Sequence, residues 1–117
     1  QKAGKLPFRY AKMGRWWGRT TVRRGQDTEL ADTEIDLLAI SKQSDQYLVG
    51  ECKFKGKPFR YSEYLDATAK LSNYKDKAEF YYYLFSESGF DEKIVEESGR
   101  SNGSIVLCGL DDIVSLK

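Results

Sequence analysis

The chain has 117 residues, of which 40% are hydrophobic and 32% charged, which is enough for one domain with one hydrophobic core and too little for two. It contains no histidine, so Ser-His-Asp catalysis, Cys-His catalysis and histidine zinc sites are excluded. Two cysteines cannot make a four-ligand zinc site or a disulfide framework. The remaining catalytic groups are carboxylates, Lys, Arg, Tyr and any metal that they hold.

The first 26 residues are strongly basic, although the net charge of the whole chain is only +1. This segment contains no acid, and aromatic residues alternate with its basic ones, a composition that suits contact with phosphates and bases. The alternative is a solvated basic edge whose aromatic residues belong to the core. We expect one residue of the Trp16-Trp17 pair to pack against the sheet, and the other to stack on a base or to contact another protein. The candidate nucleic-acid contacts in this segment are Arg15, Arg19, Arg23 and Arg24.

The first half of the chain predicts three strands. Residues 15–23 form a short strand, and the polar residues 24–33 form a loop. An apolar strand follows at residues 34–41, a polar turn leads out of it, and a second apolar strand covers residues 47–54. Gly56 and Pro58 end that strand.

The second half predicts alternating helices and strands. Apolar residues recur at helical spacing from Tyr61 to Tyr74, with Ser62 as the N-cap. Residues 80–85 are aromatic at successive positions, which indicates a central strand buried on both faces. The fold class is therefore α/β, with a mixed sheet flanked by helices in which hairpin-connected strands come first and crossovers later. The remaining elements are a helix at 91–98, a strand at 104–108 and a helix at 110–116.

Charged residues interrupt two strands that are otherwise apolar. Glu34 and Asp36 share one face of their strand, and Glu51 and Lys53 share one face of the next. A hairpin brings Asp36 and Glu51 together, and oxygen ligands favour Mg²⁺ or Mn²⁺, with the backbone carbonyl of Cys52 as a further ligand. The alternative is a buried cluster of ion pairs that binds no metal.

A site of this composition suits hydrolysis of a phosphodiester bond. A metal there lowers the pKa of a bound water and neutralises charge on the phosphate. Lys53 can position the nucleophile or stabilise the transition state. Three basic residues, Lys55, Lys57 and Arg60, follow the site directly and can grip phosphates, unless they belong to a solvated loop.

The residues Asp36 and Glu51-Cys52-Lys53 resemble the signature of the restriction-endonuclease-like superfamily, PD-(D/E)xK, with Ile35 in place of the proline. The resemblance extends over most of the chain to the C-terminal nuclease-like domain of archaeal-type AAA ATPases. The strings that carry it are Gly14-Arg15-Trp16-Trp17-Gly18, Glu34-Ile35-Asp36-Leu37-Leu38-Ala39-Ile40, Gly50-Glu51-Cys52-Lys53 and Tyr82-Tyr83-Leu84-Phe85-Ser86-Glu87-Ser88-Gly89-Phe90.

The resemblance implies that Asp36 and Glu51 are metal ligands and that Lys53 is the catalytic lysine. Many members of the superfamily also use a glutamate on an N-terminal helix, which has no clear counterpart here. Glu34 lies on the right face to replace it, and Glu29, in the predicted loop, is another candidate. Many members add a basic residue or glutamine on the helix after the motif, and Lys70 is the candidate for that position.

The sequence thus predicts a metal-dependent DNA endonuclease domain that spans residues 1–117 and is a fragment of a longer ATPase chain. The cofactor is Mg²⁺ or Mn²⁺, and the partners are DNA, the ATPase domain and, as in many relatives, a second copy in a homodimer. The alternative is a catalytically weak or inactive DNA-binding or regulatory module of the ATPase. A third, weaker interpretation is a purely structural domain.

The expected location is the cytoplasm, without a membrane segment, because no apolar run approaches the length that spans a bilayer. Cys52 and Cys108 both lie in apolar strands, so we expect them to be buried thiols in a reducing compartment.

Overall fold

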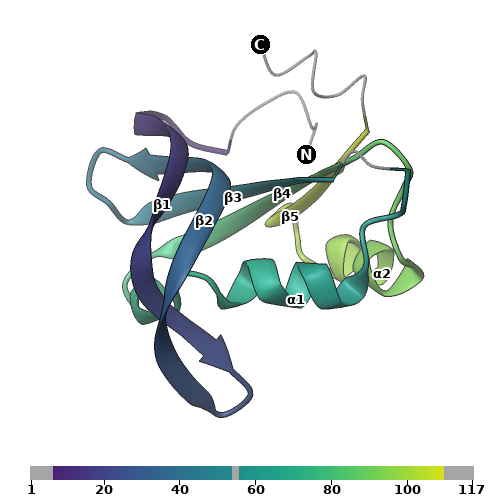
Figure 1. Ribbon diagram of the computed structural model, residues 1–117. Coiled ribbons are helices and arrows are strands. Elements are labelled where there is room, and N and C mark those ends of the chain that lie inside the picture. The colour runs from purple at the N-terminus through teal and green to yellow at the C-terminus, as the bar shows by residue number, and fades with distance from the viewer. Residues whose placement is uncertain (1–6, 54–55, 110–117) are drawn as a thin grey trace.

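The computed structural model (Figure 1) describes residues 7–53 and 56–109, without the side chains of residues 20–24, 28 and 31. The described residues form an α/β fold with one five-stranded mixed sheet in the order β1-β2-β3-β4-β5. The helices α1 and α2 both lie on the same face of that sheet. The predicted helix at 110–116 lies outside the described residues. The elements are β1 (Tyr10–Arg24), β2 (Asp27–Ser41), β3 (Gln46–Lys53), α1 (Tyr61–Ala69), the 3₁₀ helix η1 (Ser72–Tyr74), β4 (Glu79–Ser86), α2 (Glu92–Arg100) and β5 (Ile105–Cys108).

The strands β1 and β2 form a long antiparallel hairpin. Gly25, at φ +64°, occupies the first position of its two-residue turn, a conformation that favours glycine. The prediction of a loop over residues 24–33 is therefore wrong, because β2 already begins at Asp27. Within the described sheet β2 pairs with β3 over Leu37–Ile40, so its earlier residues lie alongside β1 alone. We call residues 15–36 the hairpin arm, which curves away from the sheet toward the helix side (Figure 1).

The other half of the sheet is parallel. The strands β3, β4 and β5 run in the same direction and are joined by crossovers that contain α1 and α2. The aromatic strand was predicted to be central, and this is confirmed, since β4 lies between β3 and β5. The prediction of a mixed sheet, with the hairpin connections first and the crossovers later, is also confirmed.

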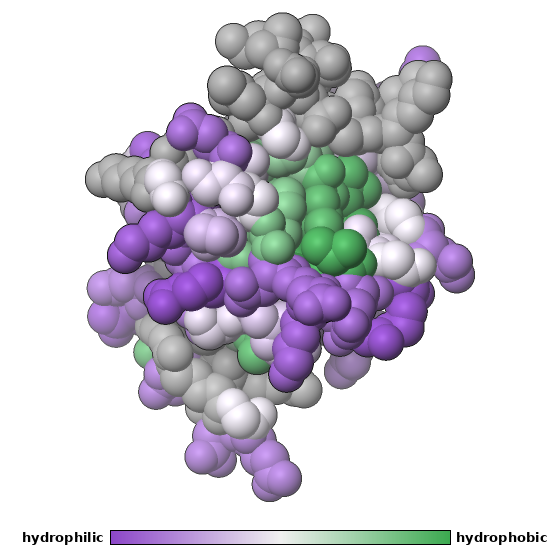
Figure 2. Space-filling view, turned by 90° about the vertical axis from the view of Figure 1, so that its right-hand side faces the viewer, coloured by the Kyte–Doolittle hydropathy of each residue, from purple (hydrophilic) through white to green (hydrophobic). Residues whose placement is uncertain are grey.

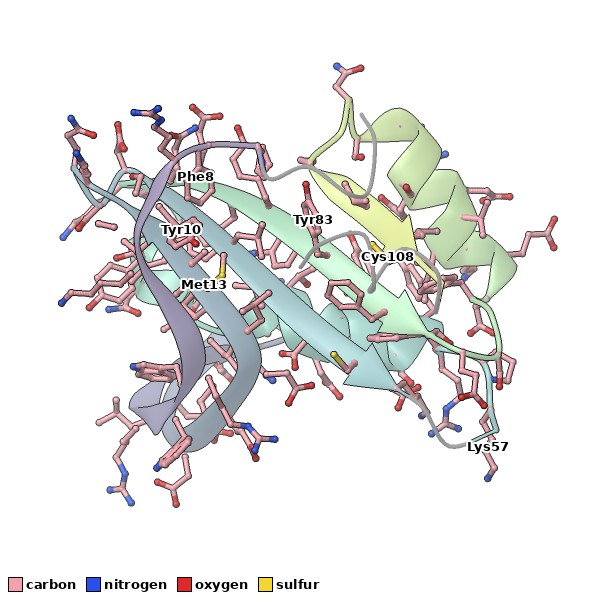
Figure 3. The ribbon with its side chains drawn as sticks, turned by 90° about the horizontal axis from the view of Figure 1, so that it is seen from above. Phe8, Tyr10, Met13, Lys57, Tyr83 and Cys108 are labelled. Carbon is pink, nitrogen blue, oxygen red and sulfur yellow. The ribbon has the colours of Figure 1, made fainter. Side chains whose placement is uncertain are left out.

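The parallel half is buried on both faces of the sheet. On the helix side Val49 and Leu84 pack with Ile94 of α2. On the opposite side Tyr83 and Cys108 belong to a second cluster, and Figure 3 shows these two side chains from that face. Burial raises the pKa of Tyr83 to about 12, since the charged phenolate is poorly solvated there.

The helix after β3 is shorter than predicted. It ends at Ala69 and is followed by η1, so the expected helix over 61–74 is interrupted. Its N-cap is Arg60 and not Ser62. The reason is the carboxylate of Glu63, which accepts a hydrogen bond from the Arg60 backbone N–H at 2.9 Å and so satisfies that end of the helix.

The two cysteines differ in their surroundings. Both are free thiols, and Cys108 is buried as expected. Cys52 is exposed, which corrects the prediction, because it lies beyond Gly50, the last residue of β3 that pairs with β2. Although the residue is exposed, partial desolvation of its thiol and the charges of Asp36 and Glu51 raise its pKa to about 11.

Hydrophobic side chains gather in the middle of the face that Figure 2 shows. Figure 2, which shows the side that faces right in Figure 1, has one hydrophobic patch among mostly hydrophilic described residues. Among the residues that the structure describes, no helix has the length and apolar character needed to cross a bilayer.

Candidate functional site

Asp36 and Glu51 come from two antiparallel strands at the point where their pairing ends. Leu37 lies opposite Gly50, so Asp36 and Glu51 are the next residues along β2 and β3. The β1–β2 register also shifts here, between the pairs Gly14–Leu38 and Trp16–Ile35. Asp36 and Leu37 are therefore opposite Arg15 alone, which is the pattern of a β-bulge. A bulge redirects side chains and bends the strand, and this one separates the hairpin arm from the sheet.

Asp36 is held from two sides. The backbone N–H of Cys52 donates a hydrogen bond to its Oδ2 at 2.9 Å. The guanidinium of Arg15 lies 3.7 Å from its Oδ1 and 3.1 Å from Oε1 of Glu34. These contacts confirm that Asp36 lies against the backbone of the Glu51-Cys52-Lys53 segment, as the hairpin predicts.

Glu51 forms an ion pair with Lys70. The Nζ of Lys70 donates to Oε2 of Glu51 at 2.6 Å and to the backbone carbonyl of Glu34. The Glu51 side chain is only 12% exposed. Its burial raises the pKa of the carboxyl above its ordinary value, against the hydrogen bond and charge of Lys70, while the charge of Asp36 raises it further. Lys70, which was expected on the helix, lies one residue after α1 ends at Ala69, as its C-cap.

Lys53 forms an ion pair with Glu63 of α1. The other oxygen of Glu63 accepts from the Arg60 backbone, and Nε of Arg60 lies 3.7 Å from it. Burial raises the pKa of Glu63, but the hydrogen bonds from Lys53 and the Arg60 backbone outweigh it, and the pKa lies below its ordinary value. Glu63 thus fixes both the start of the helix and the position of the Lys53 ammonium.

A pocket of about 300 Å³ lies between the end of β3 and α1. The residues from α1 and just beyond it share one face, at helical spacing. The sequence did not identify Glu63 and Asp66: their spacing relative to Lys70 indicates a shared helix face but not that this face lines the pocket. The lining residues are Glu51, Cys52, Lys53, Phe59, Glu63, Asp66, Ala67 and Lys70.

The residues of this site supply oxygen ligands for a hard divalent cation, but only a few of them. The described residues contain no cluster of three or more His, Cys, Asp or Glu side chains placed to hold a metal. Mg²⁺, however, is commonly held by one or two carboxylates, with waters and substrate phosphates as its other ligands. Two carboxylates and the Cys52 carbonyl, all oxygen donors, match that preference.

The basic residues of the sequence analysis fall into separate places. Arg15 and Arg19 lie on the exposed hairpin arm, and Arg60 lies beside Glu63. Lys57 lies in the loop after β3 (Figure 3) and does not line the pocket. The side chains of Arg23, Arg24 and Lys55 lie outside the described residues. Glu29, expected in a loop, lies in β2.

Comparison with known proteins places the chain in a family. The family model of archaeal and bacterial proteins of unknown function, DUF234, matches residues 1–75. The chain belongs to the DUF234 family. No curated protein matches it.

Two solved structures are similar to this DUF234 chain. One, titled as a protein of unknown function, AF1548, is 21% identical over 80% of the chain, with a TM-score of 0.49. The other, protein VC1899 from Vibrio cholerae, is 20% identical over 83% of the chain, with a TM-score of 0.48. The DUF234 chain spans about half of the first protein (49%) and a quarter of the second (24%).

Proposed function

We propose that this DUF234 chain is a metal-dependent DNA endonuclease domain of the restriction-endonuclease-like type. One observation carries the proposal. Asp36 and Glu51 are the next residues of β2 and β3 where the pairing of these strands ends, and Lys53 follows two residues after Glu51 and lines the same pocket as Glu51. This arrangement supports the resemblance to the Asp…Glu-x-Lys signature, and the mixed sheet with a helix after β3 is compatible with it.

Asp36, Glu51 and the carbonyl of Cys52 would hold Mg²⁺ or Mn²⁺. When bound, such a metal activates a water for attack and neutralises charge on the phosphate. The chain itself prepares the two acids for this role. Cys52 orients Asp36 through its backbone N–H, and Lys70 orients the poorly exposed Glu51.

Lys53 would supply the positive charge that faces the reacting phosphate. Glu63 holds its ammonium at the pocket that Glu51 also lines. A fixed cation at that position stabilises negative charge that develops in the transition state, without the cost of moving a flexible side chain into place. Glu63 is thus a positioning residue, because it acts through Lys53.

A second candidate function is a catalytically inactive DNA-binding or regulatory module of an AAA ATPase. The observation that favours it is the internal pairing of the site, Glu51 with Lys70 and Lys53 with Glu63. Paired charges of this kind also occur as structural networks with no metal. Separate measurements of metal binding and of DNA cleavage therefore distinguish this module from a nuclease.

Cleavage of supercoiled plasmid with Mg²⁺ or Mn²⁺ tests the proposal. We expect wild type to cut, and Asp36→Asn and Lys53→Met to lose about 100-fold or more of that activity. Asp36→Asn keeps an acceptor for the Cys52 N–H, so its loss would reflect the charge. Lys42→Met, in the turn between β2 and β3, is the matched control for Lys53→Met and should keep full activity.

A metal titration without DNA separates the two candidate functions. For wild type we expect Mg²⁺ or Mn²⁺ to raise the melting temperature, because a ligand that binds the native state stabilises it. Asp36→Asn should lose that rise. Equal cleavage by all variants contradicts the proposal. The absence of both the metal-dependent rise and cleavage favours the inactive module.

A further inference from the structure

Trp17 is exposed to an extent that is unusual for tryptophan. Successive residues of β1 point to opposite faces, so Trp16 packs against the helix-side core while Trp17 points outward. This confirms the prediction that one of the two tryptophans packs against the sheet. Trp17 itself remains 69% exposed. An exposed indole on a rigid strand offers a flat apolar surface to a ligand.

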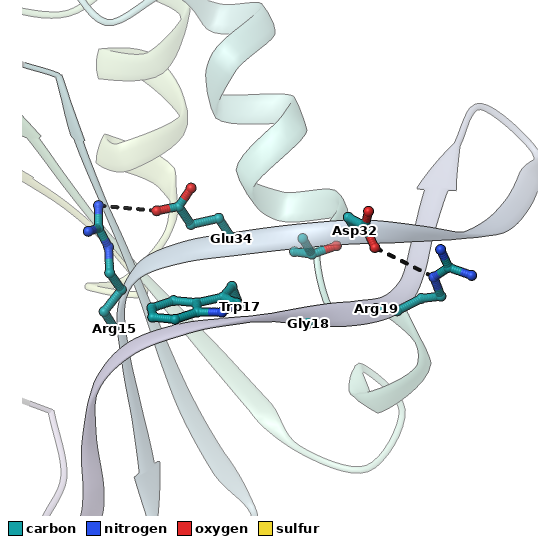
Figure 4. A pocket seen from close by; sticks show the side chains of 7 residues that line it. Arg15, Trp17, Gly18, Arg19, Asp32 and Glu34 are labelled. Atoms are coloured by element: carbon teal, nitrogen blue, oxygen red, sulfur yellow. Dashed lines mark ion pairs between the residues drawn. The ribbon is translucent and has the colours of Figure 1, made fainter.

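Arginines flank Trp17 on the same face of β1. Arg15 and Arg19 lie two residues before and after it, and Figure 4 shows the indole between the two guanidinium groups. Across the hairpin, Glu34 pairs with Arg15 at 3.1 Å and Asp32 with Arg19 at 3.5 Å. Together they line an open pocket of about 680 Å³ with Gly18 and Thr33.

The charge of this pocket argues against a site that binds only the phosphate backbone of a nucleic acid. Two arginines are opposed by two carboxylates, so the lining has no excess of positive charge that would attract the phosphates of a duplex as such. A nucleobase fits better, because its ring stacks on an indole and its N–H groups donate to carboxylates. In a duplex the ring faces are already stacked, so only an unpaired base can reach Trp17 in this way.

We propose that the hairpin arm binds an unpaired base of single-stranded DNA, stacked on Trp17, with the flanking phosphates held by Arg15 and Arg19. The carboxylates do not prevent the phosphate contacts. Exposed ion pairs are weak, and each guanidinium has five N–H donors, so it can bond a phosphate and an acid together.

The surface formed by Trp17, Arg15 and Arg19, which we call the platform, lies next to the candidate metal site. Arg15 contacts Asp36 at 3.7 Å, and Trp17 follows Arg15 by two residues, or about 7 Å along a strand. A base stacked on Trp17 therefore places the neighbouring phosphodiester toward Asp36. This inference rests on the proposed function, since it names the substrate class of that site as DNA with an unpaired stretch next to the cut.

Binding measured in EDTA tests the platform independently of cleavage. The probes are fluorescent oligonucleotides, namely a thymidine 12-mer, the same length of abasic strand and a 12-base-pair duplex, followed by fluorescence anisotropy. Trp17→Ala should weaken binding of the thymidine strand by roughly 5- to 150-fold, the range found for loss of one stacked base. Binding of the abasic strand and of the duplex should change less than twofold.

Two further variants sharpen the test. Leu30→Ala removes a side chain with the same 69% exposure on the opposite strand of the hairpin and should leave all three affinities unchanged. Trp17→Phe keeps an aromatic ring and should recover most of the affinity that Trp17→Ala loses.

The outcomes separate this inference from the proposed function. An equal loss on all three probes, no loss on any of them, or no binding of the thymidine strand by wild type overturns the base platform. A selective loss confirms it even if the plasmid remains uncut, in which case only the nuclease proposal fails. Plasmid cleavage without any effect of Trp17→Ala keeps the nuclease and removes the platform.

Discussion

The parallel half of the sheet and the hairpin arm differ in what their residues contact. In the parallel half, β4 has a strand on each side, and Leu84 is completely buried beneath the helices. In the arm, two strands pair only with each other among the described elements, and Leu30 is 69% exposed. The comparison suggests that the parallel half supplies most of the folding stability while the arm is available for binding. The candidate metal site lies where the two meet.

The largest effect that would test this division is on stability. Leu84→Ala removes a fully buried side chain from the helix-side cluster and should lower the free energy of unfolding by about 2–5 kcal/mol. Leu30→Ala, the same chemical change in the arm, should change it by less than about 0.5 kcal/mol. Urea unfolding followed by circular dichroism measures both values.

Similar losses in these two variants would contradict the division. They would mean that the arm contributes to the cooperative core, and the exposed Leu30 would then need a partner that covers it in solution.

A smaller effect, also confined to the parallel half, is a loss of folding stability at alkaline pH. The pKa of Tyr83 is about 12 in the folded chain and about 10 in the unfolded one, so between these values the unfolded state loses its proton first. The stability that Tyr83 contributes is complete below pH 10 and is lost as the pH rises through about 12, on the order of 3 kcal/mol.

Tyr83→Phe is the control for the pH dependence. Unfolding by urea at pH 9 and pH 11 should show a smaller drop in this variant than in wild type. Part of the drop should remain, since burial also raises the pKa of Tyr82. An unchanged drop would mean that Tyr83 titrates normally and is accessible to water.

The parallel half could be predicted from the sequence, whereas of the arm only the first strand, predicted at residues 15–23, could be. Runs such as Tyr82-Tyr83-Leu84-Phe85 are apolar at every position, which occurs when a strand is covered on both faces. Residues 27–33 of the arm have no apolar alternation, because, among its described side chains, the arm contacts the core only near its base, at Trp16 and Ile35. Its polar residues 27–33 therefore look like a loop, and only the Gly25 turn indicates a hairpin.

The site was partly predictable for a similar reason. Asp36, Glu51 and Lys53 are conspicuous because charges are costly within apolar strands. Glu63 is not conspicuous, since an acid in the first turn of a helix is ordinary and stabilises the helix by itself. Its contact with Lys53 depends on how α1 packs against β3, and that packing cannot be derived from the local pattern.

The smallest effect probes the boundary between the two regions. Lys70→Met should destabilise the chain by about 1–2 kcal/mol, because it leaves the poorly exposed Glu51 carboxylate without its cation. Glu51→Gln alone, and the double variant, complete a double-mutant cycle measured by urea unfolding. If the pair is coupled, the double variant loses less than the sum of the single ones, by about 0.5–1.5 kcal/mol.

The metal decides how this coupling is interpreted. If Glu51 holds Mg²⁺, added metal should recover part of the stability lost in Lys70→Met, because the divalent cation takes over the neutralisation of the carboxylate. It should recover nothing in the double variant, where the carboxylate is gone. Recovery in neither variant would assign Glu51 and Lys70 to a structural pair that binds no metal, as the inactive module requires.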